Sequence, residues 1–405
     1  MEFNDIIKDL KIKNHPLVYA PDEDTFIIAE IAFERAKGKV LEIGAGSGYT
    51  SIILARKGLD VTCSDINPDA LKIIRENSGL NDVKLKIIES DLFKKIEGKY
   101  DTVIFNPPYL PESLLDQTDP FVKSVDGGKE GYEVTKRFID SLRLHLEKNG
   151  QALIIFSSMT KLDKVISFIK ENAMEHEMLV EKPVGLMEKL YVLKITRRKF
   201  LDEAEEKGIK DIKYFACGRR GYIYTGKYKR KLIGIKTINP KSKADNIVYE
   251  FRMLQKLNRY GIGPKALFSG DDYFVYEFFV GSHIGDVWDD LKAIDKKKIF
   301  KKALGQIRQL DLLHLNKAEM SNPYKHILVN KESEICLIDF ERCKPMEKPK
   351  NLTQFVSYVT HQLYKKRFKD SPENNRFNEA IRLAKVYSEE QSDENYEALA
   401  KYLSS

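Results

Sequence analysis

The apolar run Val103-Ile104-Phe105 leads directly into Asn106-Pro107-Pro108-Tyr109. Such a run is typical of a buried parallel strand, and the two prolines must end it because they lack an N–H donor and fix φ. Asn106 Oδ1 and the Pro107 carbonyl can each accept one hydrogen of a planar NH₂ group, and the Tyr109 ring can cover its flat face. We interpret this segment as a grip for an NH₂ group; the alternative is a simple turn.

Three other predicted strands end in residues that suit a ligand. They are residues 39–43 with Gly44, Gly46 and Gly48 after them, residues 61–64 with Asp65, and residues 85–89 with Asp91. Glycines let the backbone pass close under a ligand, and an acidic residue at the second strand end can accept both ribose hydroxyls. The glycine spacing differs from G-x-G-x-x-G, which disfavours NAD. Because ligands of open α/β sheets bind at the carboxyl ends of strands, we expect one site here, with Asp91 meeting an adenine amino group.

The remaining pattern of the first half completes an α/β fold. Apolar periodicity predicts helices up to residue 36, from residue 48 to 55, from about 134 to 146 and over 161–171. Residues 100–105, 151–156 and 190–195 are predicted strands, and residues 184–189 join the last two strands. Together these elements predict a seven-stranded, Rossmann-like sheet.

In these stretches the chain resembles the class I S-adenosylmethionine-dependent methyltransferases of the HemK family. The matching segments are 18–26, 41–48, 64–68, 91–92, 105–109 and 127–131. The resemblance implies methylation of a glutamine side-chain amide in the Gly-Gly-Gln loop of a peptide-chain release factor. It also implies the short archaeal and eukaryal branch, whose members often need a small zinc-binding activator subunit. The implied cofactor-binding residues are Thr25, Glu42, Gly44, Gly46, Gly48, Asp65, Ile66, Asp91, Leu92 and Asn106, and the implied catalytic residues are Asn106, Pro107 and Tyr109.

A second pattern begins after a charged stretch at residues 197–210, and we place a domain boundary near residue 200, which gives domains 1–200 and 201–405. Residues 218–226 and 232–236 predict two strands around a turn, with a glycine-bearing loop and Lys236 on the inner face. Glu250 lies on a predicted helix over residues 244–257. A strand lysine and a glutamate on the next helix can form an ion pair that positions phosphates. Further predicted elements are a strand at 273–280, a helix at 298–313, a strand pair within 327–338, and helices in 352–405.

Residues 211–343 resemble archaeal small kinases related to Rio-type kinases and the kinase of the KEOPS complex. The resemblance implies an α+β kinase-like domain in which Gly221, Lys236 and Glu250 bind ATP and Asp339 holds Mg²⁺. Four departures bear on activity. The loop between Gly218 and Gly226 is not G-x-G-x-x-G. Glu319 would replace the catalytic aspartate, His326 replaces the metal-binding asparagine, and Glu341 replaces the glycine after Asp339-Phe340. Neutral histidine is a poorer Mg²⁺ ligand than an oxygen donor. We therefore expect nucleotide binding and leave serine/threonine kinase or ATPase activity open.

Composition and charge bear on where the protein acts and on what it binds. The net charge is a mild +7, which disfavours nonspecific DNA binding. The four cysteines show no paired spacing, and the start is not a signal peptide, so we expect a cytoplasmic protein with no membrane association. Two alternatives stay open: methylation of a base amine in DNA or RNA, or of a protein lysine, and a second domain that is only a docking module on the translation machinery.

Overall fold

The computed structural model describes residues 2–115, 122, 124–184, 188–218, 221–238, 247–360 and 374–404. It divides into two compact units, Met1–Glu206 and Lys207–Ser405. The sequence predicted the boundary near residue 200. In the structure helix α7 (Lys199–Glu206) belongs to the first unit, which moves the boundary to residue 206. This helix stays with the first unit because the buried Arg197 pairs with Asp202 at 2.7 Å and with Glu205 at 2.5 Å.

The first unit is built on one seven-stranded sheet in the order β3-β2-β1-β4-β5-β7-β6. Strands β1 to β5 run parallel, whereas β7 is antiparallel to both β5 and β6. The predicted seven-stranded, Rossmann-like sheet is therefore confirmed. The strands are β1 (Lys39–Ile43), β2 (Asp60–Asp65), β3 (Lys86–Glu89), β4 (Tyr100–Phe105), β5 (Leu146–Ser157), β6 (Met174–Val184) and β7 (Glu188–Arg197).

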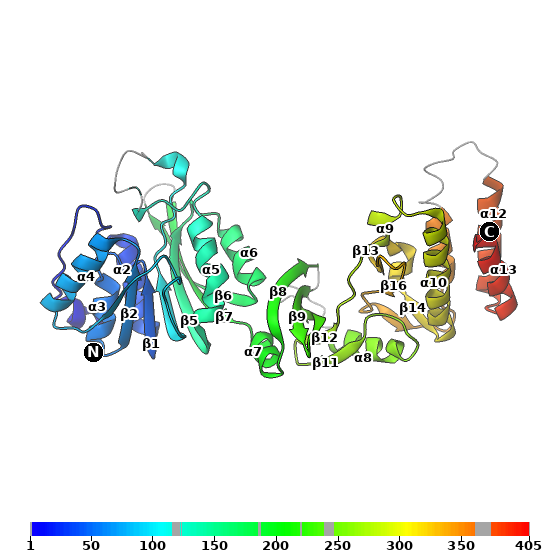
Figure 1. Cartoon of the computed structure of the whole chain (residues 1–405), viewed down its shortest axis with the longest axis horizontal. Helices are drawn as coiled ribbons and strands as arrows, with labels where there is room; N and C mark the ends of the chain where they lie inside the picture. The colour runs from blue at the N-terminus through cyan, green and yellow to red at the C-terminus, as the bar shows by residue number, and fades with distance from the viewer. Residues whose placement is uncertain are drawn as a thin grey trace. The chain divides into compact units, whose positions relative to one another are not determined.

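Both faces of this sheet are covered by helices, which explains the unbroken apolar runs in its central strands. In β4, Val103 and Phe105 point to one core and Ile104 points to the other. Helices α2, α3 and α4 pack on one face, and α5 and α6 pack on the other (Figure 1). Their bounds are α2 (Glu23–Arg35), α3 (Tyr49–Arg56), α4 (Pro68–Leu80), α5 (Glu133–His145) and α6 (Leu162–Glu171); a short α1 (Phe3–Ile7) precedes them.

Two strands differ from the sequence prediction. Strand β5 starts at Leu146, five residues earlier than predicted, because Leu146 pairs with Tyr100 before a register shift. The edge strand β6 was implied by the connection predicted at residues 184–189, but it was given no bounds. Most of its side chains are partly or fully exposed, so it lacks the apolar signal of a central strand, and Pro183 is tolerated because one edge of β6 is unpaired.

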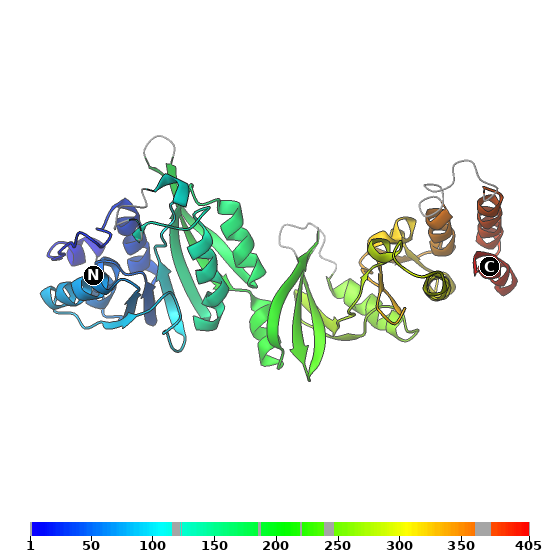
Figure 2. The same ribbon diagram turned by 45° about the horizontal axis from the view of Figure 1, so that its top comes forward.

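The second unit begins with a five-stranded antiparallel sheet in the order β11-β12-β10-β9-β8, of which β8 to β10 are green in Figure 2. Gly221 was predicted to lie in a phosphate-binding loop. It is instead the first residue of β9 and pairs with Ile238 of β10, so it is a strand residue at the edge of a turn. The neighbouring residues 219 and 220 lie outside the described residues. The strands are β8 (Lys210–Cys217), β9 (Gly221–Tyr228), β10 (Lys231–Ile238), β11 (Ala266–Ser269) and β12 (Tyr273–Glu277).

The rest of the second unit is mainly helical and shares one large apolar core with α8. The predicted helix at 244–257 is α8 (Ile247–Asn258), and residues 244–246 lie outside the described part. Helix α10 (Ala293–Leu312) begins five residues before the predicted start. The other elements are α9 (Ile284–Val287), α11 (Asn351–Tyr358), α12 (Asn374–Glu389), α13 (Asp393–Ser404), β13 (Ser282–His283), β14 (Leu315–Lys317), β15 (Ile327–Val329), β16 (Ile335–Leu337) and β17 (Cys343–Pro345).

Among the described residues, no helix combines the length and the apolar character needed to cross a bilayer.

Candidate functional site

A cavity of about 950 Å³ opens at the carboxyl ends of β1, β2 and β4 in the first unit. It is lined by the turn after β1, where Gly44, Gly46 and Gly48 have φ of +63°, +54° and +81°. These left-handed angles favour glycine, and Gly48 then starts α3. A Cβ on Gly44 would lie 3.3 Å from the Phe105 ring, so the turn passes close to the end of β4. The cavity is large enough for a nucleotide-sized ligand.

Asp65, at the end of β2, lines the cavity and accepts a hydrogen bond from this turn. Its Oδ2 accepts a hydrogen bond from the Gly46 backbone at 2.9 Å, and its Oδ1 accepts one from the Asn67 backbone at 2.9 Å. Burial raises the pKa of Asp65, against the opposing effect of these backbone donors. Each oxygen keeps a second lone pair, so the residue still suits two ribose hydroxyls.

Asp91 also lines the cavity, but its carboxylate already has partners. Lys94 and Arg137 both lie 2.7 Å from Asp91 Oδ2, and the hydrogen bond from Lys94 is the main cause that lowers the pKa of Asp91. An adenine amino group would therefore have to share this acceptor with two cations. The other predicted cofactor residues, Thr25, Glu42, Ile66 and Leu92, line the same cavity.

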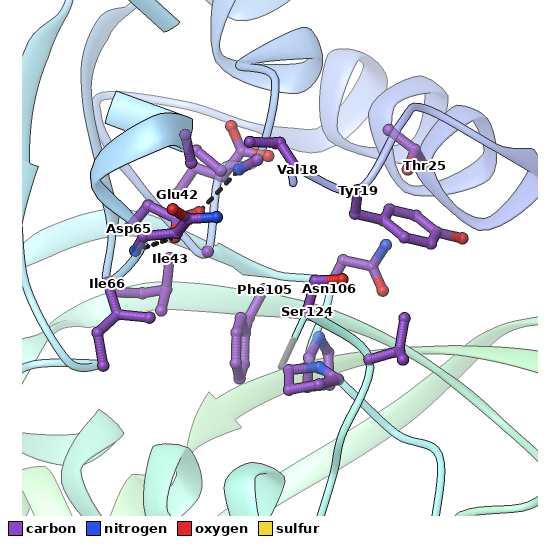
Figure 3. Close-up of a pocket in the computed structure, with 18 of the residues that line it drawn as sticks. Val18, Tyr19, Thr25, Glu42, Ile43, Asp65, Ile66, Phe105, Asn106 and Ser124 are labelled. Atoms are coloured by element: carbon purple, nitrogen blue, oxygen red, sulfur yellow. Dashed lines mark hydrogen bonds between the residues drawn. The ribbon is translucent and has the colours of Figure 1, made fainter. Parts of the chain in front are cut away.

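The acceptor end of the cavity is formed by Asn106 and Tyr109. Figure 3 shows Asn106 beside Tyr19 and Thr25, on the opposite side of the cavity from Asp65 and Ile66. Asn106 Nδ2 donates to Asp24 Oδ2 at 3.0 Å, whereas Asn106 Oδ1 is buried and has no hydrogen-bond partner among the described residues. An unsatisfied buried acceptor is costly, which indicates that a ligand donor fills this position.

Two groups in this cavity were missed as functional residues by the sequence analysis. Tyr19 and Asp24 lie in segment 18–26, which resembles the HemK family, but neither was given a role. The Asp24 carboxylate accepts hydrogen bonds from Tyr19, Asn106 and Tyr109. Tyr19 lines the cavity, and burial followed by the Asp24 charge raises its pKa. The donors to Asp24 are up to 85 residues away in sequence, so no local pattern signals their meeting.

Glu42 of β1 is almost fully buried on the same cavity wall and accepts a hydrogen bond from Ser51 of α3. Burial raises its pKa to about 7, although hydrogen bonds from Ser51 and Thr50 act in the opposite direction. The residue therefore titrates near neutral pH in the folded protein.

The second unit brings Lys236, Glu250 and Asp339 together as the sequence suggested. Lys236 Nζ lies 2.7 Å from Glu250 Oε2 and 3.1 Å from Asp339 Oδ1. The backbone N–H of Phe340 donates to Glu250 at 3.2 Å, which joins the end of β16 to α8. Glu250, Asp339 and Glu341 each offer a carboxylate oxygen within 4.8 Å of the other two. Oxygen donors of this kind suit a hard cation such as Mg²⁺.

Glu319 and His326 lie next to this cluster in a more constrained setting. Glu319 is only 3% exposed, and Arg342 Nε and Lys317 Nζ lie 2.6 and 3.2 Å from its two oxygens. Despite burial, these cations lower the pKa of Glu319. His326 Nδ1 is buried, 3.8 Å from Asp339 Oδ2 and without a hydrogen-bond partner in the described part of the chain, and burial lowers its pKa. A carboxylate held by two cations is a weak base, which counts against proton abstraction by Glu319.

Most of the comparisons with known proteins concern the first unit. The family model described as "Methyltransferase small domain" matches residues 9–183. A Methanocaldococcus jannaschii protein named "Putative protein N5-glutamine methyltransferase MJ0928" is 42% identical over 166 residues, which cover 40% of this chain and 84% of that protein. The chain belongs to the HemK family of N5-glutamine methyltransferases.

Other HemK-family relatives are more distant. Human "Methyltransferase HEMK2" is 29% identical over 44% of this chain and 90% of its own length. "Release factor glutamine methyltransferase" of Lactococcus lactis is 30% identical over 155 residues. The match covers 36% of this chain and 57% of that protein. Two solved structures are also similar. One is an E. cuniculi Mtq2–Trm112 complex (27% identity, TM-score 0.37, 45% of this chain and 99% of that chain). The other is WbdD with a kinase inhibitor (15% identity, TM-score 0.45, 99% and 94%).

Proposed function

We propose that the HemK-family unit methylates the side-chain amide nitrogen of a glutamine, in the Gly-Gly-Gln loop of a peptide-chain release factor. The observation that carries this proposal is the buried, unpartnered Asn106 Oδ1 at the acceptor end of the cavity, as seen among the described residues. It supplies one acceptor for an NH₂ group, and the Pro107 carbonyl supplies the second. The names of the relatives support glutamine as the substrate residue.

The cavity fits S-adenosylmethionine on its own geometry. The turn from Gly44 to Gly48 has the close backbone approach that such a ligand needs, and Asp65 offers free lone pairs to the ribose. When bound, the cofactor would supply an electrophilic methyl carbon on a sulfonium. Its C–S bond would break with the electron pair left on sulfur, and the methylated nitrogen would lose one proton to water.

The protein's contribution to this transfer is orientation. An amide nitrogen is a weak nucleophile because its lone pair is delocalised into the carbonyl. Asn106 and the Pro107 carbonyl hold both N–H bonds and so aim the lone pair, while Tyr109 packs on the amide plane. No basic side chain is required at the nitrogen, and alignment in a pocket with little water is the main source of rate enhancement.

The same grip could hold the exocyclic amine of a base or the amine of a lysine, so the acceptor must be identified directly. The full-length protein is incubated with methyl-labelled donor and a cell extract, and labelled peptides and nucleic acids are mapped by mass spectrometry. Label on the glutamine of a Gly-Gly-Gln loop is expected. Label on a base, or on lysine in place of glutamine, overturns the assignment of the acceptor.

We also propose the setting of this reaction. The acceptor would be a translation factor, so the enzyme would work beside the translation machinery in the cytoplasm, where its four free cysteines stay reduced. A small zinc-binding activator subunit is the expected partner of the short HemK branch, which includes archaeal members. Co-purification of the tagged protein from its native cells, followed by mass spectrometry, tests for both partners.

For the second unit we propose ATP binding by a kinase-like site. The contact of Lys236 with Glu250 and Asp339 carries this proposal, since it places a fixed cation beside carboxylates that can hold Mg²⁺. Asp339 is the principal metal ligand, with Glu250 and Glu341 near it. Burial keeps His326 neutral, which makes it a poor Mg²⁺ ligand. Arg342 and Lys317 make the Glu319 carboxylate a weak base. We therefore expect slow phosphoryl transfer or none at all.

Melting of the full-length protein with and without ATP and Mg²⁺ tests this second proposal. A rise in melting temperature is expected for the native sequence and not for Lys236→Ala, since the lysine contacts the phosphates. Lys265→Ala serves as the control, because Lys265 is an exposed lysine of the same unit whose ion pair is with Glu277. If ATP stabilises neither the native protein nor the control, the unit is a docking module.

A further inference from the structure

Asp24 is a buried carboxylate at which three side chains of the acceptor site meet. Its side chain is only 4% exposed and lies in the first turn of α2. Asp24 Oδ2 accepts from Asn106 Nδ2 at 3.0 Å and from the Tyr109 hydroxyl at 3.3 Å, and Oδ1 accepts from the Tyr19 hydroxyl at 3.2 Å. All three of these donors are uncharged side chains.

This contact decides which way the Asn106 amide faces. A primary amide can present either its oxygen or its NH₂ group to a pocket, and the two orientations have nearly the same shape. An ionised carboxylate only accepts hydrogen bonds, so it must face Asn106 Nδ2. Asn106 Oδ1 is then turned away from Asp24. It is buried and has no partner within the described ranges, and Asn106 lines the cavity.

We propose that Asp24 is a positioning residue that fixes the Asn106 amide with its oxygen toward the acceptor, and so restricts the site to acceptors that donate an N–H bond. The proposal rests on the proposed function, in which Asn106 holds the substrate amide that receives the methyl group. A charged acceptor behind Nδ2 also polarises the amide and strengthens Oδ1 as a hydrogen-bond acceptor. Without Asp24 the flipped amide would present two donors to the substrate NH₂ group and repel it.

A purely structural role for Asp24 is the competing explanation. Its Oδ1 also accepts from the Thr25 backbone at 2.6 Å, and an acid in the first turn stabilises a helix. In that case its replacement lowers stability but acts on catalysis independently of Asn106. The two explanations therefore differ in whether the effects of changing Asp24 and Asn106 are coupled.

An exchange of the two side chains separates these explanations. We compare Asp24→Asn, Asn106→Asp and the double variant, measuring kcat and KM on a purified release factor and donor affinity by calorimetry. Each single variant should lose about 10²-fold in kcat, as expected for loss of one preorganised polar contact. The double variant restores a donor at position 24 facing an acceptor at position 106, and the second carboxylate oxygen at position 106 is left toward the cavity. It should therefore recover at least tenfold over either single variant. Losses that simply multiply in the double variant overturn the proposal.

Asp22→Asn is the matched control, because Asp22 lies two residues away, outside the cavity lining, and undergoes the same change of charge. Asn retains the cap that Asp22 forms on α2, where it accepts from the Glu23 backbone. This variant should keep the native kcat. A loss equal to that of Asp24→Asn would mean that a general charge effect, and not orientation of Asn106, controls the rate.

An NMR measurement tests the contact between Asp24 and Asn106 without any methyl-accepting substrate. The side-chain NH₂ signal of Asn106 in a ¹⁵N–¹H spectrum is identified by its absence in Asn106→Asp. It should shift in Asp24→Asn and stay unchanged in Asp22→Asn. An unchanged signal in Asp24→Asn overturns the proposed contact. If the native protein methylates no release factor while the signal shifts as expected, the proposed substrate fails and the orienting role of Asp24 stands.

Discussion

Raising the pH from 5 to 8 should destabilise the HemK-family unit through Glu42. Burial raises the pKa of this carboxyl from an ordinary value of 4.5 to about 7 in the folded protein. The folded state therefore holds this proton more tightly than the unfolded state. The stabilising contribution is complete below pH 4.5 and is lost as the pH rises through 7. Each pKa unit is worth about 1.4 kcal/mol, so the loss between pH 5 and 8 is about 2–3 kcal/mol.

The assay is chemical denaturation of the full-length protein at several pH values. Trp288 is the single tryptophan and belongs to the second unit, so its fluorescence follows that unit, and a circular-dichroism transition without a fluorescence counterpart reports the first. Glu42→Gln keeps an acceptor for Ser51 and removes the titrating group. The native protein should lose about 2–3 kcal/mol more than this variant between pH 5 and 8. Equal losses in the two proteins would refute the argument that Glu42 titrates near neutral pH.

Three further outcomes are expected. Asp65→Ala should weaken S-adenosylmethionine binding by roughly 10²-fold or more in calorimetry, because two hydrogen bonds to a charged acceptor are lost and Gly46 is no longer held; unchanged affinity would remove Asp65 from the site. Asn106→Ala should lower kcat on the order of 10²-fold with little effect on donor affinity, measured by initial rates at saturating donor. Gly234→Ala should destabilise the second unit by about 1–3 kcal/mol, seen by tryptophan fluorescence, since its Cβ would lie 2.4 Å from the Tyr276 ring.

The central sheet and the cofactor end of the cavity follow from local sequence patterns. An apolar run that ends in glycine, Asp65 or Asn106 predicts both the position of a strand and the functional residue at its carboxyl end. In β1, β2 and β4 these signals are strong, because most residues of these parallel strands are buried. The structure brings the predicted residues of the first unit to the lining of one cavity, except Gly48, which lies in the turn beside it.

The remaining features depend on contacts between distant segments. Asp24 looks like an ordinary acid at a helix start, and its role appears only when Asn106 approaches from 82 positions away. Asp91 likewise meets Arg137, which is 46 positions away on α5. Strands β6 and β8 carry many charged and exposed residues, so periodicity alone does not separate them from loops.

The antiparallel placement of β7 has a consequence for how the first unit assembles. Strand β7 lies between β5 and β6, yet β6 and β7 are neighbours in sequence and pair with each other over most of their length. They can form early as a local hairpin and then add to the sheet together. Until they do, β5 presents an unpaired edge that carries Ile154, Ile155 and Phe156, a pattern that favours aggregation. During synthesis this edge stays uncovered until Arg197, the last residue of β7, has been added, so completion of the methyltransferase fold depends on its last two strands.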